Sequence, residues 1–282
     1  LVLIDVVKGL AEGIALDISH AVSILGVDVS VKGSSDFSQI KDSDLIIVSA
    51  GYPRGKGIKR EELISKNVGI IVDIAKKIKS YAPNSVVILT TNPVDILTYL
   101  MYRELDFPRE RVLGFGGILD SGRYRYYLAR KLGVAPSNIN ALVIGQHGDY
   151  MIPLDKYSNL SGIPITKLLD KRNRRIAVEE TKFAGDEIIN LCGFSSMYGP
   201  AAGLYLAANS IINDLRRIHV MCVPLNGEYG VYNVAVNVPV ILGKSGVENI
   251  VEIPLSEEEK EVFVEAVNVI RDGIKKVLEI RS

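Results

Sequence analysis

The chain contains 282 residues, a length that fits one large domain or two domains of ordinary size. Hydrophobic residues make up 48% of it and charged residues 23%, a composition that excludes intrinsically disordered and fibrous proteins. Lysine plus arginine number 33, and aspartate plus glutamate also number 33. With a formal net charge of zero, we expect neither nucleic acid nor an anionic membrane as a partner, because both require an extended basic surface.

The sequence also indicates the cellular environment in which the protein works. No apolar run approaches the ~18 residues that span a bilayer, so a membrane segment is not expected. The cysteines, Cys192 and Cys222, form neither a CxxC pair nor a disulfide framework, which predicts a reducing compartment such as the cytoplasm. The sequence opens on Leu1 within an apolar run and without a methionine, so we expect its natural start to lie upstream.

The first part of the chain alternates short strand patterns with helical ones. Residues 1–5, 45–50, 86–90 and 112–115 are apolar runs typical of buried strands, and the alternation at Val27, Val29 and Val31 predicts a half-exposed strand. Residues 65–79 carry apolar side chains at helical spacing. This order predicts a doubly wound parallel sheet with helices on both faces, over residues 1–116.

The pattern changes in residues 117–282. We expect a helix near Asp120, a strand over 139–144, and an antiparallel hairpin formed by residues 220–225 and 234–242 around a turn at 226–230. A final helix begins after Ser256, with Glu259 as its capping-box partner. The sequence therefore predicts a second domain of α+β type, over residues 117–282.

Asp5 lies at the end of the first strand pattern. In a dinucleotide-binding fold, an acidic residue ~20 positions after a glycine-rich loop binds the adenosine ribose hydroxyls and disfavours NADP. The loop itself would lie upstream of Leu1. A surface aspartate at a strand end explains the same residue equally well.

Two loops follow strands at the sheet edge where ligands bind in open α/β folds. Residues 50–60 carry Arg54 and Arg60, whose forked guanidinium groups suit carboxylates, although a solvated basic loop is the simpler interpretation. Asn92 could orient a carbonyl group with its amide. Taken alone, a turn before Pro93 explains it better.

The strongest local signal is His147, which lies in the sequence Gly-Gln-His-Gly-Asp after a strand pattern. A histidine with flexible backbone on both sides suits proton transfer near neutral pH. Asp120 and Arg123 are three positions apart, so both can lie on one side of their helix. Complementing the helix dipole is the simpler role for Asp120 alone.

In this order, the segments resemble the lactate/malate dehydrogenase family, in its lactate-dehydrogenase-like malate dehydrogenase branch. The segments that carry the resemblance are Asp5, residues 15–21, 51–60, 66–67, 91–93, 119–123, 145–149 and 225–230. The resemblance implies a Rossmann-type N-terminal domain, NAD as the cofactor, no metal, and a homotetramer or homodimer. It also implies that the second domain holds the substrate. Among the departures from the family pattern, Gly122 stands where alanine is common.

The resemblance further implies a role for each candidate residue. His147 is the catalytic acid and base and Asp120 its carboxylate partner; the residues expected to bind substrate are Arg54, Arg60, Asn92 and Arg123. The residues expected to bind the cofactor are Asp5, Asn67, Thr90, Thr91 and Asn92.

Arg54 decides the expected substrate. Lactate dehydrogenases typically carry glutamine at the matching position, whereas an arginine would pair with the second carboxylate of oxaloacetate. We therefore expect an NAD-dependent malate dehydrogenase. The alternatives are a lactate or broad 2-hydroxy-acid dehydrogenase and a non-catalytic dinucleotide-binding protein.

Overall fold

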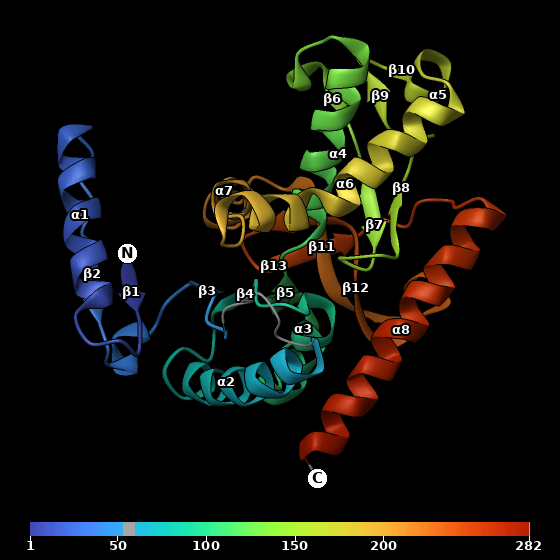
Figure 1. Cartoon of the computed structure of the whole chain (residues 1–282). Helices are drawn as coiled ribbons and strands as arrows, with labels where there is room; N and C mark the ends of the chain where they lie inside the picture. Colours follow the sequence, from blue (N-terminus) through green and yellow to red (C-terminus); the bar gives the residue numbers. More distant parts are fainter. Residues whose placement is uncertain (53–59, 282) are drawn as a thin grey trace.

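The computed structural model describes the backbone of residues 1–52 and 60–281 and the side chains of 1–52 and 64–279 (Figure 1). Its first unit contains β1 (Val2–Ile4), α1 (Leu10–Ile24) and β2 (Lys32–Ser34). The two strands pair in parallel with Val2 opposite Lys32, and the 3₁₀ helix η1 (Phe37–Ile40) follows.

One expectation about this unit is wrong. The half-exposed strand predicted at 27–31 is irregular, and β2 begins only at Lys32. The alternating valines are not paired in a sheet because β1 reaches only Lys32–Ser34 in its parallel register. Val27 and Val29 remain exposed.

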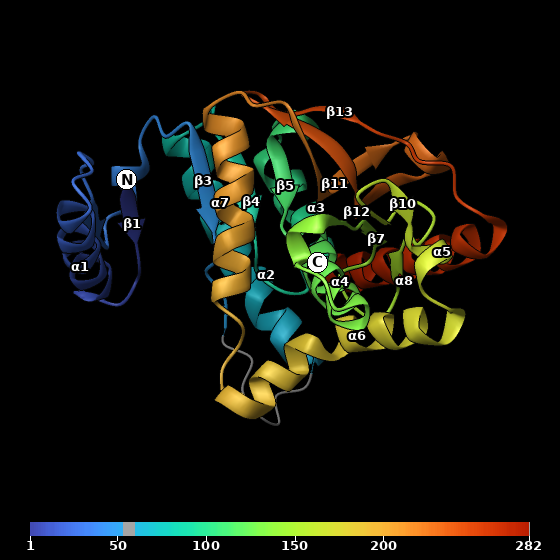
Figure 2. The same cartoon turned by 90° about the horizontal axis from the view of Figure 1, so that it is seen from above.

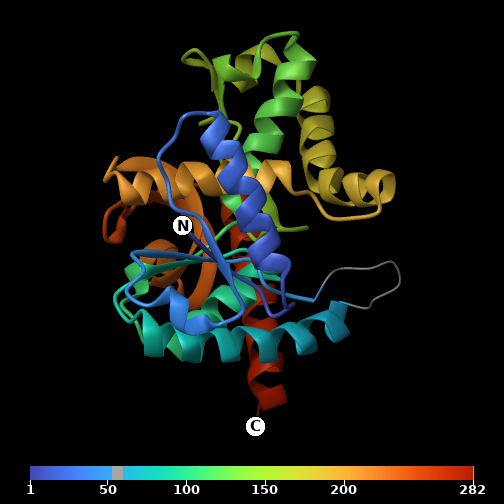
Figure 3. The ribbon, with the colours of Figure 1, turned by 90° about the vertical axis from the view of Figure 1, so that its left-hand side faces the viewer.

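The other parallel strands lie in the main sheet. β3 (Leu45–Val48), β4 (Val86–Leu89) and β5 (Val112–Gly114) pair in parallel, as the apolar runs predict. The helices α2 (Arg60–Tyr81) and α3 (Val94–Leu105) lie below these strands in Figure 1, and α7 (Tyr198–Ile212) lies above them. All four residues of β4 are buried, which explains its uniformly apolar sequence. The predicted α/β fold with a parallel, helix-covered sheet is thus confirmed. It differs from the prediction in one respect, since β1 and β2 form a separate two-stranded sheet with α1 beside it (Figures 1 and 3).

The sheet continues into the second half of the chain. β11 (Arg217–Asn226) pairs antiparallel with β5, and the hairpin to β12 (Tyr232–Gly243) forms as predicted, around η4 (Glu228–Gly230). β7 (Val143–Gly145), β8 (Met151–Pro153) and β13 (Gly246–Ile250) complete the sheet. The predicted boundary at residue 116 falls between β5 and α4, and hydrogen bonds of the sheet cross it; the boundary itself stays a prediction.

The strand predicted at 139–144 is two strands. β6 (Ile139–Asn140) joins β9 (Asn159–Leu160) and β10 (Ile163–Pro164) in a small antiparallel sheet, whereas β7 joins the main sheet. The pattern predicted one strand because Ile139 in β6 and all of β7 are buried, although the partners of the two strands differ. Sequence periodicity indicates which residues are buried, but it does not indicate which sheet a strand joins.

The remaining helices surround the antiparallel part (Figures 1 and 2). They are α4 (Gly117–Leu132), α5 (Ile165–Leu168), α6 (Lys171–Cys192) and α8 (Glu257–Arg281), with the 3₁₀ helices η2 (Arg109–Arg111) and η3 (Pro136–Asn138). The predicted capping box of α8 forms, since Ser256 N donates to Glu259 Oε2 at 2.8 Å and Glu259 N to Ser256 Oγ at 3.2 Å. Among the described helices, none is long and apolar enough to span a membrane.

Candidate active site

The centre of the site is a histidine–carboxylate pair. Asp120 lies in the first turn of α4 with only 2% of its side chain exposed, and His147 lies in the loop between β7 and β8. The Nδ1 atom of His147 is 2.7 Å from Asp120 Oδ2. A carboxylate in this position accepts the Nδ1–H hydrogen bond, which fixes the orientation and tautomer of the ring. The interaction gives Asp120 a specific partner beyond the helix dipole.

The backbone around His147 depends on glycine at two positions. Gly145 ends β7 with a φ of 88°, a left-handed conformation that side chains with a Cβ rarely adopt. Gly116 precedes α4, and a Cβ added there would lie 3.0 Å from the Cβ of His147. The loop and the helix can therefore approach closely enough for His147 to reach Asp120.

Arg123 lies beside this pair, one turn further along α4. Its Nη1 is 3.8 Å from Asp120 Oδ1, and 16% of its side chain is exposed. The buried Oδ1 of Asp120 has no hydrogen-bond partner among the described residues. From α6, Gly185 faces the guanidinium, since a Cβ built there would be 3.6 Å from Arg123 Nη2. The structure thus brings His147, Asp120 and Arg123 together, and the guanidinium can bind a carboxylate group next to the imidazole.

The surrounding charges change the acidity of His147. Burial lowers the pKa of the imidazole, but the charge and hydrogen bond of Asp120 and the charge of Asp95 outweigh burial, and the pKa is raised overall. The charge of Arg123 opposes this increase. A raised pKa keeps a larger fraction of the ring protonated near neutral pH, which suits a group that both donates and accepts a proton.

A second set of candidate residues connects the loops after β3 and β4. The buried Asn67 accepts a hydrogen bond from Tyr52 N at 2.7 Å and donates one to Asn92 O at 2.9 Å. The Thr91 hydroxyl donates to Ala50 O at 2.6 Å. These bonds fix the positions of both loops at the carboxyl edge of the parallel strands, while the side chain of Asn92 remains exposed.

Further groups suited to a dinucleotide follow β1, in the separate two-stranded sheet, and β4, in the main sheet. Asp5 follows β1, and one carboxylate oxygen accepts the Val7 N–H at 2.8 Å, while the other has no hydrogen-bond partner among the described residues. Thr90 follows β4 and is partly exposed. An acceptor carboxylate, a hydroxyl and the Asn92 amide are donor and acceptor types that fit the ribose and nicotinamide groups of NAD.

The structure does not describe the side chains of two residues that were predicted to bind the substrate. Arg54 lies outside the described residues. Arg60 begins α2, but its side chain also lies outside the described part.

The sequence analysis did not identify two buried residues, Asp95 and Asn237, that lie next to the His147 loop. Asp95 on α3 accepts a hydrogen bond from the backbone N–H of His147, and Asn237 on β12 donates one to Asp95. Each is a polar residue inside a mainly apolar segment, VDILTYL for Asp95 and VAVNVPV for Asn237. A buried polar group needs a partner, so these interruptions were the signal in the sequence.

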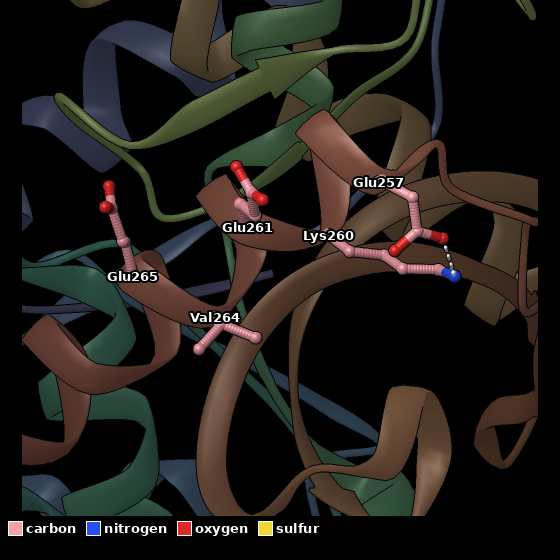
Figure 4. Close-up of a pocket in the computed structure, with 5 residues that line it drawn as sticks. All are labelled: Glu257, Lys260, Glu261, Val264 and Glu265. Atoms are coloured by element: carbon pink, nitrogen blue, oxygen red, sulfur yellow. Dashed lines mark hydrogen bonds and ion pairs between the residues drawn. The ribbon is translucent and has the colours of Figure 1, made fainter.

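Other features of the described surface carry none of the predicted site residues. A shallow hollow on α8 is lined by Glu257, Lys260, Glu261, Val264 and Glu265 (Figure 4). Lys260 pairs with Glu257 at 2.7 Å, and the remaining glutamates are typical of a solvated helix face. Within the described residues, no group of histidine, cysteine and acidic side chains could hold a metal ion.

Models of two known domain families match almost the whole chain. Residues 1–114 match the lactate/malate dehydrogenase NAD-binding domain, and residues 118–281 match the alpha/beta C-terminal domain of the same family. The chain belongs to the lactate/malate dehydrogenase family. It is thus a member of an oxidoreductase family with an NAD-binding domain, and the expected fold class and cofactor, NAD, are confirmed.

Individual members of the lactate/malate dehydrogenase family are similar over nearly the whole chain. The malate dehydrogenase of Pyrobaculum calidifontis is 51% identical over 271 residues, which cover 96% of this chain and 88% of that protein. The structure of the Aeropyrum pernix malate dehydrogenase is 44% identical, with a TM-score of 0.95 and coverage of 98% and 90%. The lactate dehydrogenase of Eimeria maxima, solved with NADH and oxamate, is 33% identical, with a TM-score of 0.95 and coverage of 99% and 87%.

Proposed function

We propose that this chain catalyses the reversible oxidation of malate to oxaloacetate with NAD, and that His147 transfers the proton. The observation that carries the proposal is the 2.7 Å contact between His147 Nδ1 and the buried Asp120, with Arg123 beside it. The name of the similar Pyrobaculum and Aeropyrum proteins supports the choice of substrate. NAD, when bound, accepts a hydride from the carbon that carries the hydroxyl group.

The proton path follows from the geometry of the pair. Because Nδ1 contacts Asp120, the other ring nitrogen, Nε2, is the atom that takes the proton of the substrate hydroxyl during oxidation. Asp120 stabilises the resulting imidazolium. In the reverse direction the same atom returns the proton to the carbonyl oxygen, which requires His147 to be protonated first.

The remaining candidate residues would hold the reactants. Arg123 binds the carboxylate next to the reacting carbon as a bidentate fork. The Asn92 amide orients the reacting oxygen, and Arg60 polarises it. Asp5 accepts hydrogen bonds from the ribose hydroxyls. The other residues proposed to bind the cofactor are Asn67, Thr90 and Thr91.

Arg54 would select the dicarboxylate. Its charge pairs with the second carboxylate of oxaloacetate, whereas pyruvate leaves the charge unpaired in a closed site. An unpaired buried charge costs several kcal/mol. The lactate dehydrogenase among the similar structures makes lactate the competing substrate.

The test is an assay of the full chain, with NADH oxidation followed in parallel with oxaloacetate and with pyruvate. We expect turnover with oxaloacetate and little with pyruvate. Turnover with pyruvate alone would contradict the choice of malate, and turnover with neither would contradict an enzymatic function. The variant His147→Asn should lose ~10²–10⁴-fold in kcat while it still binds NADH, since the ring transfers a proton and does not hold the cofactor.

We also expect the chain to form a homotetramer or homodimer. Large apolar side chains are exposed at the end of α6 and along α7, among them Leu191, Phe194, Met197, Tyr198, Tyr205 and Ile212. Contiguous exposed apolar surface is typical of subunit contacts. Light scattering of the purified protein measures the mass directly, and a monomer would contradict this expectation.

A further inference from the structure

Asp95 is a buried carboxylate for which the proposed reaction gives no role. It lies in the first turn of α3 and is 3% exposed. Its Oδ2 accepts the backbone N–H of His147 at 3.0 Å, and its Oδ1 accepts a hydrogen bond from Asn237 Nδ2, also at 3.0 Å. Both oxygens therefore face N–H donors, an arrangement that suits an ionised carboxylate.

Asn237 extends these contacts to the two segments that meet at the site. It lies on β12 and is 2% exposed. Its Nδ2 also donates to Gly145 O at 3.0 Å, at the end of β7, and its Oδ1 accepts from Gly117 N at 2.8 Å, at the start of α4. One amide thus joins the strand before His147, the helix that carries Asp120, and Asp95.

We propose that Asp95 and Asn237 are positioning residues for proton transfer, which hold the His147 loop and the start of α4 together so that the imidazole meets Asp120. In addition, the negative charge of Asp95 stabilises the imidazolium. The role in turnover rests on the proposed function, whereas the effect on His147 does not.

The charges around the pair support this role. His147 faces Asp120 and Arg123 from α4 and Asp95 from α3, while Cys222 of β11 lies against Asp95. Burial raises the pKa of Asp95 to about 6, and the charge and backbone hydrogen bond of His147 limit the increase. Burial raises the pKa of the Cys222 thiol well above its usual value, so it stays neutral. At pH 7 and above, Asp95 is therefore the second negative charge acting on His147.

The decisive variant is Asp95→Asn, which keeps the shape of the side chain. It removes the charge and replaces one carboxylate oxygen with an NH₂ group, so one of the two N–H donors loses its acceptor. We expect kcat for oxaloacetate reduction to fall ~10–100-fold with little change in KM, less than the loss of the general acid itself. The pKa of His147 should fall by ~0.5–1 unit because the imidazolium loses a stabilising charge.

Thr98→Val is the matched control. Thr98 lies one turn further along α3 and is fully buried, and its uncharged hydroxyl lies against the Cys222 thiol. The substitution alters the same helix without changing a charge, so kcat and the pKa of His147 should match the unmodified protein. If Thr98→Val has the same effect as Asp95→Asn, packing of α3 is responsible and the proposal is wrong.

The pKa is measured without substrate or cofactor, by NMR titration of the imidazole groups. The chain has three histidines, His20, His147 and His219, so the His147 signal is assigned by its absence in His147→Asn. An unchanged titration together with an unchanged kcat in Asp95→Asn overturns the proposal. Failure of the oxaloacetate assay in the unmodified protein would overturn the proposed function, while the titration would still test Asp95.

A second variant covers the case in which Asp95→Asn does not fold. Asn237→Ser leaves the Asp95 carboxylate in place but removes the hydrogen bonds of the amide to Gly145, Gly117 and Asp95. We expect kcat to fall, and the pKa of His147 to fall less than in Asp95→Asn, because the carboxylate of Asp95 remains beside the imidazole. An undiminished kcat in this variant would show that the amide does not position the site.

Discussion

At the scale of single residues, the two oxygens of Asp120 face different groups. Oδ2 contacts the imidazole at 2.7 Å, and Oδ1 faces the Arg123 guanidinium at 3.8 Å. One buried carboxylate thus lies beside both the group that would transfer the proton and the group that would bind the substrate. A substrate carboxylate at Arg123 would then lie close to the imidazole, which is the arrangement that hydroxyl oxidation requires.

The first prediction at this scale concerns Arg54. Arg54→Gln should shift the ratio of kcat/KM for oxaloacetate over pyruvate toward pyruvate by ~10²-fold or more, because it removes a charge worth several kcal/mol when unpaired. The measurement is steady-state kinetics with both substrates. Lys56→Gln, which removes a positive charge two positions away in the sequence, is the control and should leave the ratio unchanged. A ratio that stays constant in Arg54→Gln would contradict the assigned role.

At the scale of elements, α4 contributes two of the candidate site residues, Asp120 and Arg123. It contains a glycine at position 122, where a Cβ would meet no atom within 4 Å. We expect Gly122→Ala to raise the free energy of unfolding by ~0.5–1 kcal/mol, because alanine restricts the unfolded chain and favours helix. Urea denaturation measures the change, and a lower midpoint would contradict it.

Gly116→Ala is the matched comparison at the entrance to the same helix. There a Cβ would lie 3.0 Å from both the His147 Cβ and the Asn237 Oδ1, so the loop must move. This variant should lower kcat, whereas Gly122→Ala should not.

The sequence anticipated many elements because hydrophobic periodicity is a local property. The parallel strands β3, β4 and β5, the helix α2, the β11–β12 hairpin and the capping box of α8 all lie where the pattern indicated. The pattern failed at residues 27–31 and 139–144. In both cases the outcome depends on which partner strand is within reach, and that is a tertiary property.

At the scale of the whole molecule, an ion pair joins the two halves of the chain. Arg109, before β5, donates to both carboxylate oxygens of Glu228, in the turn of the β11–β12 hairpin, at 3.0 and 2.8 Å. The hydrogen bond from Arg109 is the main reason that the pKa of Glu228 falls to about 2, and burial opposes it. The pair therefore stabilises the connection between β5 and the hairpin.

This pair predicts a pH-dependent contribution to stability. A carboxylate whose pKa is lower in the folded state stabilises fully above its unfolded value of 4.5, and the stabilisation is lost as pH falls toward 2. Glu228→Gln should therefore be less stable by ~2 kcal/mol near neutral pH, with the difference closing between pH 4.5 and 2.

Denaturant unfolding across that pH range measures the difference. Glu110→Gln is the control, since Glu110 also pairs with Arg109 but is 46% exposed, and an exposed pair contributes little. A difference between Glu228→Gln and the unmodified chain that does not vary with pH would contradict the argument.

By itself, the sequence determined the class of fold, the family, and His147, Asp120 and Arg123 as the candidate catalytic and substrate-binding groups; these depend on residue types at fixed spacing. Only the tertiary structure decided that Asp95 and Asn237, 142 positions apart, form a hydrogen bond next to His147. Their contact depends on how α3 packs against β12, and no local pattern encodes the distance between two elements.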